Sequence, residues 1–116
     1  MAMNQPIFDD DEKEALGYLA KDSISWKAQT VFGYVITRTE TEDEAIAVIR
    51  KQGLTYLKGV WQYYDKDDHD WYPCIIQSAS ETLVKVTRTN AMGYQEPDTF
   101  KVVLLKNPDE NSLIKN

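Results

Sequence analysis

Residues 59–64, Gly-Val-Trp-Gln-Tyr-Tyr, open the stretch of this chain that decides its fold. An acidic turn follows them, and then come residues 71–76 (Trp-Tyr-Pro-Cys-Ile-Ile), 82–87 (Thr-Leu-Val-Lys-Val-Thr) and 99–105 (Thr-Phe-Lys-Val-Val-Leu-Leu). Short segments rich in β-branched and aromatic residues, separated by turn residues, are typical of antiparallel strands. Residues 59–107 are therefore predicted to form an antiparallel meander.

Two helices and one long strand are predicted before this meander. Residues 8–21 carry apolar side chains at helical spacing, after acidic residues that suit a helix start. Residues 25–38 switch to period-two alternation, which indicates a strand. Thr41, with Glu44 three residues later, forms a capping box, so we expect a second helix over residues 42–52.

Residues 54–64 return to a strand pattern, and the relation of this strand to the one at 25–38 stays open. The intervening helix could be a right-handed crossover between parallel strands, or the two strands could be antiparallel. The chain is thus predicted to be a single α+β domain, residues 1–116, with two helices packed on a mainly antiparallel, strongly curved sheet of about five strands. Its C-terminal half is expected to be barrel-like, and residues 1–6 and 109–116 to be frayed termini.

The composition is that of a small globular protein with an acidic surface. Of its 116 residues 42% are hydrophobic, and no apolar run approaches the ~20 residues of a membrane helix. With no signal-peptide pattern at the start and one cysteine, a cytoplasmic location without membrane contact is expected. The net charge of −6 arises within residues 1–70, which hold 8 Lys and Arg against 14 Asp and Glu. An acidic surface repels phosphate backbones, which argues against direct nucleic-acid binding and favours a basic protein partner.

The supply of catalytic and metal-ligating side chains is small. Residues 65–70, Asp-Lys-Asp-Asp-His-Asp, invite comparison with a calcium loop, but His69 stands at the fifth position and Ile76 at the twelfth. His69 is the sole histidine, and its aspartate neighbours favour the charged imidazolium, which is a poor general base. No second histidine completes a zinc site with Cys74, which is expected to be a small buried hydrophobe. No metal or cofactor is therefore predicted, and a binding role is favoured over an enzymatic one.

Aromatic residues form the more informative constellation, since five of the ten Trp and Tyr residues lie between positions 61 and 72. Period-two alternation places Trp61 and Tyr63 on one face of their strand and Tyr64 on the other, and it splits Trp71 and Tyr72 in the same way. One face can then fill the core while the other lines a groove. Rings flanked by carboxylates suit a cation, a methylated amine or an arginine. The same rings could instead simply complete the core and cross-strand pairs of a small sheet.

Several of these motifs together resemble a Tudor domain, a small SH3-like barrel. They are the aromatic strand at 59–64 before the acidic turn, Trp-Tyr-Pro-Cys-Ile-Ile at 71–76, Val-Lys-Val-Thr at 84–87 and Gly-Tyr-Gln-Glu at 93–96. The resemblance implies a bent five-stranded barrel that reads methylated Lys or Arg in an aromatic cage, with Tyr64, Tyr72 and Tyr94 as the cage residues. The aromatic residue that the family carries shortly before its Gly-Tyr turn is absent, because residues 87–89 are Thr-Arg-Thr.

The leading functional hypothesis is a non-catalytic acidic binding module that recognises a basic or cationic protein segment. Aromatic side chains would supply contact area, and carboxylates would steer the partner. The side chains concerned are Tyr64, Trp71, Tyr72, Tyr94, Asp67, Asp68 and Asp70.

Two alternative functions stay open. A curved sheet and two helices could enclose an apolar pocket, lined by Trp26, Phe32 and Tyr34, that holds a small ligand or a reaction. Exposed strand edges could instead join two copies of the chain in a structural homodimer.

Overall fold

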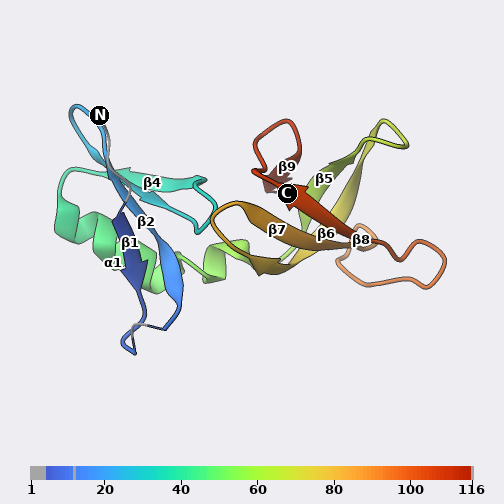
Figure 1. Cartoon of the computed structure of the whole chain (residues 1–116), viewed down its shortest axis with the longest axis horizontal. Coiled ribbons are helices and arrows are strands. Elements are labelled where there is room, and N and C mark those ends of the chain that lie inside the picture. Colours follow the sequence, from blue (N-terminus) through green and yellow to red (C-terminus); the bar gives the residue numbers. More distant parts are fainter. Residues whose placement is uncertain (1–4, 12, 116) are drawn as a thin grey trace. The chain divides into compact units, whose positions relative to one another are not determined.

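The computed structural model describes residues 5–11 and 13–115, and over these it contains nine strands in two antiparallel sheets, with one α-helix (Figure 1). The predicted α+β class with mainly antiparallel sheet is confirmed. The chain divides into two compact units, Met1–Leu57 and Lys58–Asn116. Within the described residues, no helix has the length and apolar character needed to cross a membrane.

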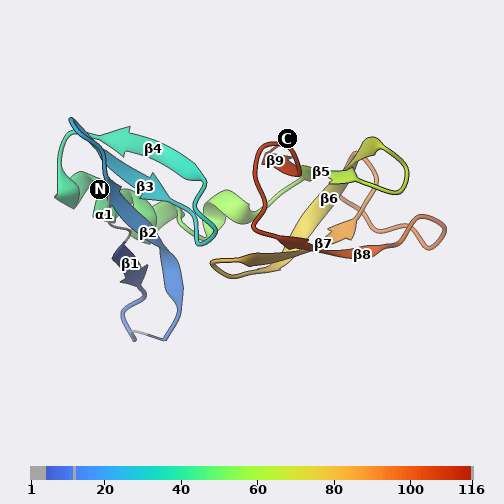
Figure 2. The same ribbon diagram turned by 45° about the horizontal axis from the view of Figure 1, so that its top comes forward.

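The first unit is a four-stranded sheet with a helix packed against it (Figure 2). Its strands lie in the order β1-β2-β3-β4, and each is antiparallel to its neighbour. The elements are β1 (Gln5–Phe8), β2 (Ala15–Lys21), β3 (Trp26–Gln29), β4 (Val35–Thr39), α1 (Glu42–Gln52) and the 3-10 turn η1 (Thr55–Leu57).

The helix predicted over residues 8–21 is wrong, because this stretch belongs to the hairpin of β1 and β2. The acidic residues expected to start that helix lie in the connecting turn, where the carboxylate of Asp9 accepts the backbone N–H of Lys13 at 3.0 Å. Gly17 accounts for the formation of a strand by these residues. A Cβ at this position would collide with the carbonyl oxygen of Gln29, so the glycine allows β2 to lie close to its neighbour. Strand pairing therefore overrides the local helical pattern.

The long strand predicted over residues 25–38 is also wrong, since the chain reverses in its middle. β3 ends at Gln29 and β4 begins at Val35. Between them the N–H of Thr30 donates to the carbonyl oxygen of Tyr34 at 2.8 Å, and the Thr30 hydroxyl accepts the N–H of Tyr34 at 3.1 Å. Gly33 has a φ of 93°, which glycine adopts without steric cost. The period-two pattern continues through residues 30–34, so it gave no indication that the chain reverses there.

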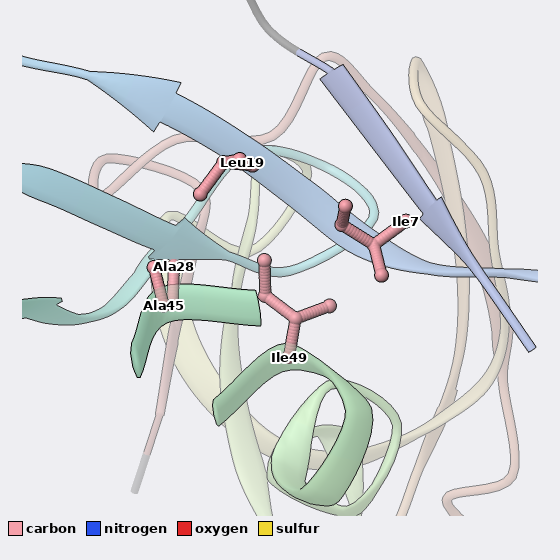
Figure 3. Close-up of a cluster of buried hydrophobic side chains, with 5 residues drawn as sticks. All are labelled: Ile7, Leu19, Ala28, Ala45 and Ile49. Carbon is pink, nitrogen blue, oxygen red and sulfur yellow. The ribbon is translucent and has the colours of Figure 1, made fainter. Parts of the chain in front are cut away.

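The helix predicted over residues 42–52 is confirmed with the same limits. Thr41 caps it, with its hydroxyl oxygen accepting the N–H of Glu44 at 3.2 Å. Two residues of the helix are fully buried and complete the core of this unit. Figure 3 shows that core, in which side chains of three strands meet those of α1: Ile7, Leu19, Ala28, Ala45 and Ile49.

The second unit is a five-stranded antiparallel sheet in the order β8-β7-β6-β5-β9. Its strands are β5 (Trp61–Asp65), β6 (Asp70–Ala79), β7 (Leu83–Arg88), β8 (Val102–Lys106) and β9 (Leu113–Lys115). The predicted meander is thus confirmed, whereas the predicted strand start at residue 54 is not, because η1 occupies residues 55–57. Since β3 and β4 belong to the other sheet, neither predicted relation between the strands at 25–38 and 54–64 occurs.

The sheet of the second unit is not a closed barrel, because β8 and β9 form its two edges. β9 lies within the segment expected to be frayed, and Leu113 in it is fully buried. At the other end of the chain, Gln5 and Pro6 belong to β1, while residues 1–4 lie outside the described part. Fully buried side chains on one face of the sheet make the core of this unit: Trp61, Tyr63, Cys74, Val84, Val86 and Leu113.

Candidate functional site

The hairpin of β5 and β6 carries two pairs of aromatic rings, one on each face. Tyr64 lies opposite Trp71, with ring centres 5.5 Å apart and planes at 66°. Tyr63 lies opposite Tyr72, with ring centres 6.1 Å apart. Tyr63 is fully buried in the core, whereas Tyr64 and Trp71 are half-buried. The predicted division of the aromatic residues between the two faces is confirmed, and the Tyr64–Trp71 pair is the one on the outer face.

Tyr72 is already engaged by two charged groups of its own unit. The guanidinium carbon of Arg88 lies 3.6 Å from the centre of the Tyr72 ring. The Tyr72 hydroxyl donates a hydrogen bond of 2.9 Å to the carboxylate of Asp68. This hydrogen bond to an anion is the largest cause of the raised pKa of the Tyr72 phenol. A cation, an aromatic ring and a carboxylate therefore form one connected group.

The turn between β5 and β6 presents carboxylates at its surface. The Asp67 side chain is 88% exposed, and its carboxylate lies 3.7 Å from the ammonium of Lys101. The carboxylate of Asp68 accepts the hydrogen bond from the Tyr72 hydroxyl, and the carboxylate of Asp70 accepts the backbone N–H of Trp71 at 2.8 Å. All three aspartates predicted to steer a partner therefore lie at the same end of the hairpin as the Tyr64–Trp71 pair.

Asp65 organises this turn, and sequence reasoning missed it. One carboxylate oxygen accepts the N–H groups of Asp67 and Asp68 at 2.9 and 3.2 Å, and the other accepts the Lys101 ammonium at 2.8 Å. The hydrogen bond from Lys101 is the main reason why the pKa of the Asp65 carboxyl falls to about 2. An aspartate that ends a strand before a polar turn is a recognisable turn signal. Its partner 36 residues away is not visible in the local sequence.

Tyr94 stands apart from the other predicted aromatic residues. It lies in the loop between β7 and β8, and 67% of it is exposed. The side chain of Asn90 shapes this loop, since its carbonyl oxygen accepts the N–H groups of Met92 and Tyr94 at 2.9 and 3.0 Å. Among the ring contacts found in the described residues, none joins Tyr94 to Tyr64, Trp71 or Tyr72.

A groove of about 480 Å³ lies beside the end of β5, and residues from both faces of that strand line it. One wall is the edge strand β8, and the other comprises the end of β5 and the approach to β9. No sequence pattern indicated it, because its walls come from segments about 40 residues apart. The residues along the second wall are Tyr63, Tyr64, Asp65, Lys66, Asp67, Asn111 and Ser112.

The two reactive side chains singled out in the sequence, Cys74 and His69, lie in different surroundings. Cys74 is fully buried, and this burial raises the pKa of its thiol to about 12. His69 is exposed in the acidic turn. Among residues 5–11 and 13–115, no three His, Cys, Asp or Glu side chains are grouped to hold a metal ion.

The aromatic residues suggested as the lining of an apolar cup lie in the first unit. Phe32 is buried, and its ring meets that of Tyr34 edge-on at 4.8 Å. Trp26 packs against the buried cluster around Leu19 and Ile49. All three side chains therefore have packing partners within their own unit.

Comparison of the chain with protein-family models, with curated proteins and with solved structures found no match.

Proposed function

We propose that the second unit is a non-catalytic binding module that recognises a basic or cationic protein segment. The observation that carries this proposal is the Tyr64–Trp71 pair, half-buried on the outer face of the hairpin, beside the exposed carboxylate turn. A cation placed against aromatic rings gains about 0.5–1 kcal/mol at an exposed site. Asp67 and Asp70 add attraction at longer range and would speed the encounter with a positively charged partner.

The contact between Arg88 and Tyr72 supports this proposal from within the molecule. There a guanidinium stacks on a tyrosine whose hydroxyl is held by Asp68 of the same turn. The hairpin thus already binds one arginine on an aromatic ring. An arginine or lysine of a partner would use the same chemistry on the opposite face, at Tyr64 and Trp71.

The Tudor resemblance is compatible with the proposal but would place the ligand differently. It implies a cage made by Tyr64, Tyr72 and Tyr94. Because Arg88 occupies the ring of Tyr72, we assign the partner's cation to Tyr64 and Trp71, with Tyr94 as a second, separate contact on the loop after β7.

The test uses fluorescein-labelled peptides of alternating glycine and arginine, with the arginines replaced by neutral citrulline in a matched control peptide. The arginine peptide should bind, and its Kd should rise with ionic strength. Leucine in place of Tyr64 or Trp71 should weaken binding roughly two- to fivefold, as expected for loss of an exposed cation–π contact.

Charge-matched variants separate the acidic turn from the overall charge of the protein. Asp67→Asn and Asp70→Asn should weaken binding and reduce its dependence on salt. Asp11→Asn removes the same charge from the exposed turn between β1 and β2 of the first unit and should bind like the unmodified protein. Equal binding of the citrulline peptide, or equal loss in the Asp11 variant, would contradict the proposal.

A further inference from the structure

The edge strand β8 has a row of backbone groups that β7 does not use. At the start of the β7–β8 ladder, the carbonyl oxygen of Lys101 accepts the N–H of Arg88 at 2.8 Å. Hydrogen bonding alternates along an antiparallel ladder, so Val103 and Leu105 also face β7. Among the hydrogen bonds found within the described residues, none engages the groups that point away from the sheet. They belong to Val102, Leu104 and Lys106.

The side chains of these three residues lie on the outer face of the sheet, the face that also carries Trp71. Val102 pairs with Thr87 and Thr87 pairs with Ile75, which is four residues after Trp71 on β6, so all of these side chains point to one side. Leu104 is 61% exposed and Val102 is 45% exposed, although both are apolar. An edge with unused backbone groups beside exposed apolar side chains can accept an extended segment as one more strand.

Two hollows adjoin β8, and their charged lining is mostly basic. The charged residues that line the groove of about 480 Å³ are Lys66, Lys101, Lys106, Asp65 and Asp67. Among the described residues, Lys85 is the one charged residue that lines a second hollow of about 340 Å³, beside Ser78, Ala79, Ser80, Leu83 and Leu104. Four lysines therefore stand against two aspartates, although the chain as a whole has a net charge of −6.

The two carboxylates of the groove already have a cation. The ammonium of Lys101 lies 2.8 Å from the carboxylate of Asp65 and 3.7 Å from that of Asp67. Lys66 belongs to the same turn as both aspartates. Positive and negative charges therefore balance at the end of β8 where the strand begins.

The excess of positive charge lies at the other end of β8. Among the ion pairs of the described residues, none includes Lys85 or Lys106. Lys85 lies opposite Leu104, and Lys106 lies opposite Leu83, so both ammonium groups belong to the outer face. The turn between β6 and β7 adds one carboxylate, Glu81, which leaves the ammonium groups in excess. The outer face of β8 thus combines exposed apolar side chains with net positive charge.

Lysines on an edge strand commonly prevent unwanted pairing with other chains. Because the charge stands at one end of β8, it repels a strand that brings a cation to that end and attracts a strand that brings a carboxylate there. Charge complementarity therefore indicates an acidic occupant.

We propose that β8 binds an acidic, extended segment of another protein as an added antiparallel strand. A carboxylate of the segment lies opposite Lys106, and apolar side chains lie opposite Leu104 and Val102. These three residues of the segment alternate with others, so all three side chains point to the outer face. The site is separate from the Tyr64–Trp71 pair, takes a partner of opposite charge and does not depend on the proposed function.

The test uses the acetylated and amidated peptide Thr-Glu-Thr-Val-Thr-Val-Thr with ¹⁵N-labelled protein. On saturation, hydrogen exchange at the amides of Val102, Leu104 and Lys106 should slow at least tenfold, with little change at Val103 and Leu105. Glutamine in place of the glutamate should raise the Kd two- to fivefold, as expected for loss of an exposed ion pair.

Two N-methylated peptides test the pairing itself. In an antiparallel ladder, the residues opposite Val102, Leu104 and Lys106 direct their own N–H groups toward β8. N-methyl groups on the glutamate and valines should therefore abolish binding, whereas N-methyl groups on the threonines should change the Kd less than threefold.

Charge variants of the protein test the assigned carboxylate position. Lys106→Gln should raise the Kd of the glutamate peptide two- to fivefold and leave that of the glutamine peptide unchanged, because the two groups interact with each other. Lys51→Gln removes the same charge from an exposed position of α1 in the first unit and should bind like the unmodified protein.

Leu104→Pro supplies the matched change in the backbone. Proline removes the outward N–H of Leu104, which β7 does not bind, so an edge strand tolerates it. We expect at least a tenfold higher Kd, whereas Leu104→Thr, which keeps the N–H, should change it less than threefold. Circular dichroism of both variants confirms that the fold is retained.

Four results would overturn the proposal. They are equal binding of the glutamate and glutamine peptides, normal binding of both N-methylated peptides, absence of binding at millimolar peptide, and a protein dimer that Leu104→Pro converts to a monomer. The last result would show that a second copy of the chain occupies the edge. The arginine peptide proposed for Tyr64 and Trp71 should bind Leu104→Pro as tightly as the unmodified protein, so the two proposals stand or fall separately.

Discussion

The guanidinium of Arg88 is stacked on the ring of Tyr72, 3.6 Å from its centre, in the hairpin proposed to bind cations. Arg88 ends β7 and lies opposite Cys74, two residues after Tyr72 on the neighbouring strand. Asp68 holds the Tyr72 hydroxyl from the turn. The contact thus joins the β5–β6 turn to the start of the loop that carries Tyr94.

Removal of the Asp68 charge and removal of the Arg88 charge should shift the pKa of the Tyr72 phenol in opposite directions. Asp68→Asn should lower that pKa toward its ordinary value, because the carboxylate that accepts the phenol proton raises it. Arg88→Gln should raise the pKa further, because the guanidinium favours the phenolate. Ultraviolet titration of each variant, with Tyr72→Phe subtracted, measures both shifts. Shifts of the same sign in the two variants would contradict the assigned contacts.

Acid should destabilise the second unit through Asp65. The pKa of its carboxyl is about 2 in the folded protein, below the unfolded value near 4. A carboxyl group whose pKa is lower in the folded than in the unfolded protein stabilises the fold at pH values above its unfolded pKa. This stabilisation is lost as the pH falls from about 5 toward 2. Asp65→Asn should lower stability at neutral pH and flatten its decline in acid, as followed by urea unfolding.

Two variants control this experiment. Asp67→Asn changes a largely exposed carboxylate of the same turn and should keep the acid sensitivity of the unmodified protein. Lys101→Met removes the partner of Asp65 and should reproduce the flatter pH profile of Asp65→Asn. A steep acid transition that survives in Asp65→Asn would assign the effect to other carboxyl groups.

Gly53→Ala should destabilise the first unit by about 1–3 kcal/mol, the usual cost of overpacking. Gly53 ends α1 with a φ of −51°, which any residue can adopt, and alanine is favoured over glycine by about 1 kcal/mol in helices. A Cβ there, however, would collide with the carbonyl oxygen of Leu16. Gln52→Ala, one residue earlier and exposed, should be neutral or stabilising. Greater stability of Gly53→Ala in urea unfolding would show that this contact relaxes freely.

Cys74 should resist alkylation until the protein unfolds. Its thiol is fully buried with a pKa of about 12, against an ordinary value of 9.0, so about a thousandfold less thiolate is present at neutral pH. Iodoacetamide labelling, followed by mass spectrometry, should become rapid only in denaturant. Ser78→Cys in a Cys74→Ala background places a thiol at an exposed position of β6 and should react without denaturant.

Features that depend on near neighbours in the chain were predictable. Thr41 and Glu44 located α1 because a capping box needs only residues three apart. Alternation in β5 correctly placed Tyr63 and Tyr64 on opposite faces, because successive strand residues point to opposite sides, and the structure shows that the Tyr63 face is the buried one. The aromatic and acidic content of the candidate site was therefore readable from the sequence.

The sequence did not predict which segments of the chain pair as strands. Residues 15–21 carry a helical pattern, yet they form β2, because hydrogen bonds to β3 and the close approach at Gly17 are available only in the folded unit. The turn between β3 and β4 was hidden by alternation that continued across it. Local preferences are worth less than 1 kcal/mol per residue, so pairing with a neighbouring strand decides such cases.

The sequence by itself determined the α+β class, the helix at 42–52, the meander and the hairpin with its aromatic rings and aspartates. Tertiary structure alone decided that Lys101 neutralises Asp65, that Arg88 covers Tyr72, and that β8 borders a groove with a free edge. The physical reason is separation along the chain. Alternation, capping and turn chemistry act over a few residues, whereas these contacts join residues far apart in sequence, which only the strand order of the sheet brings together.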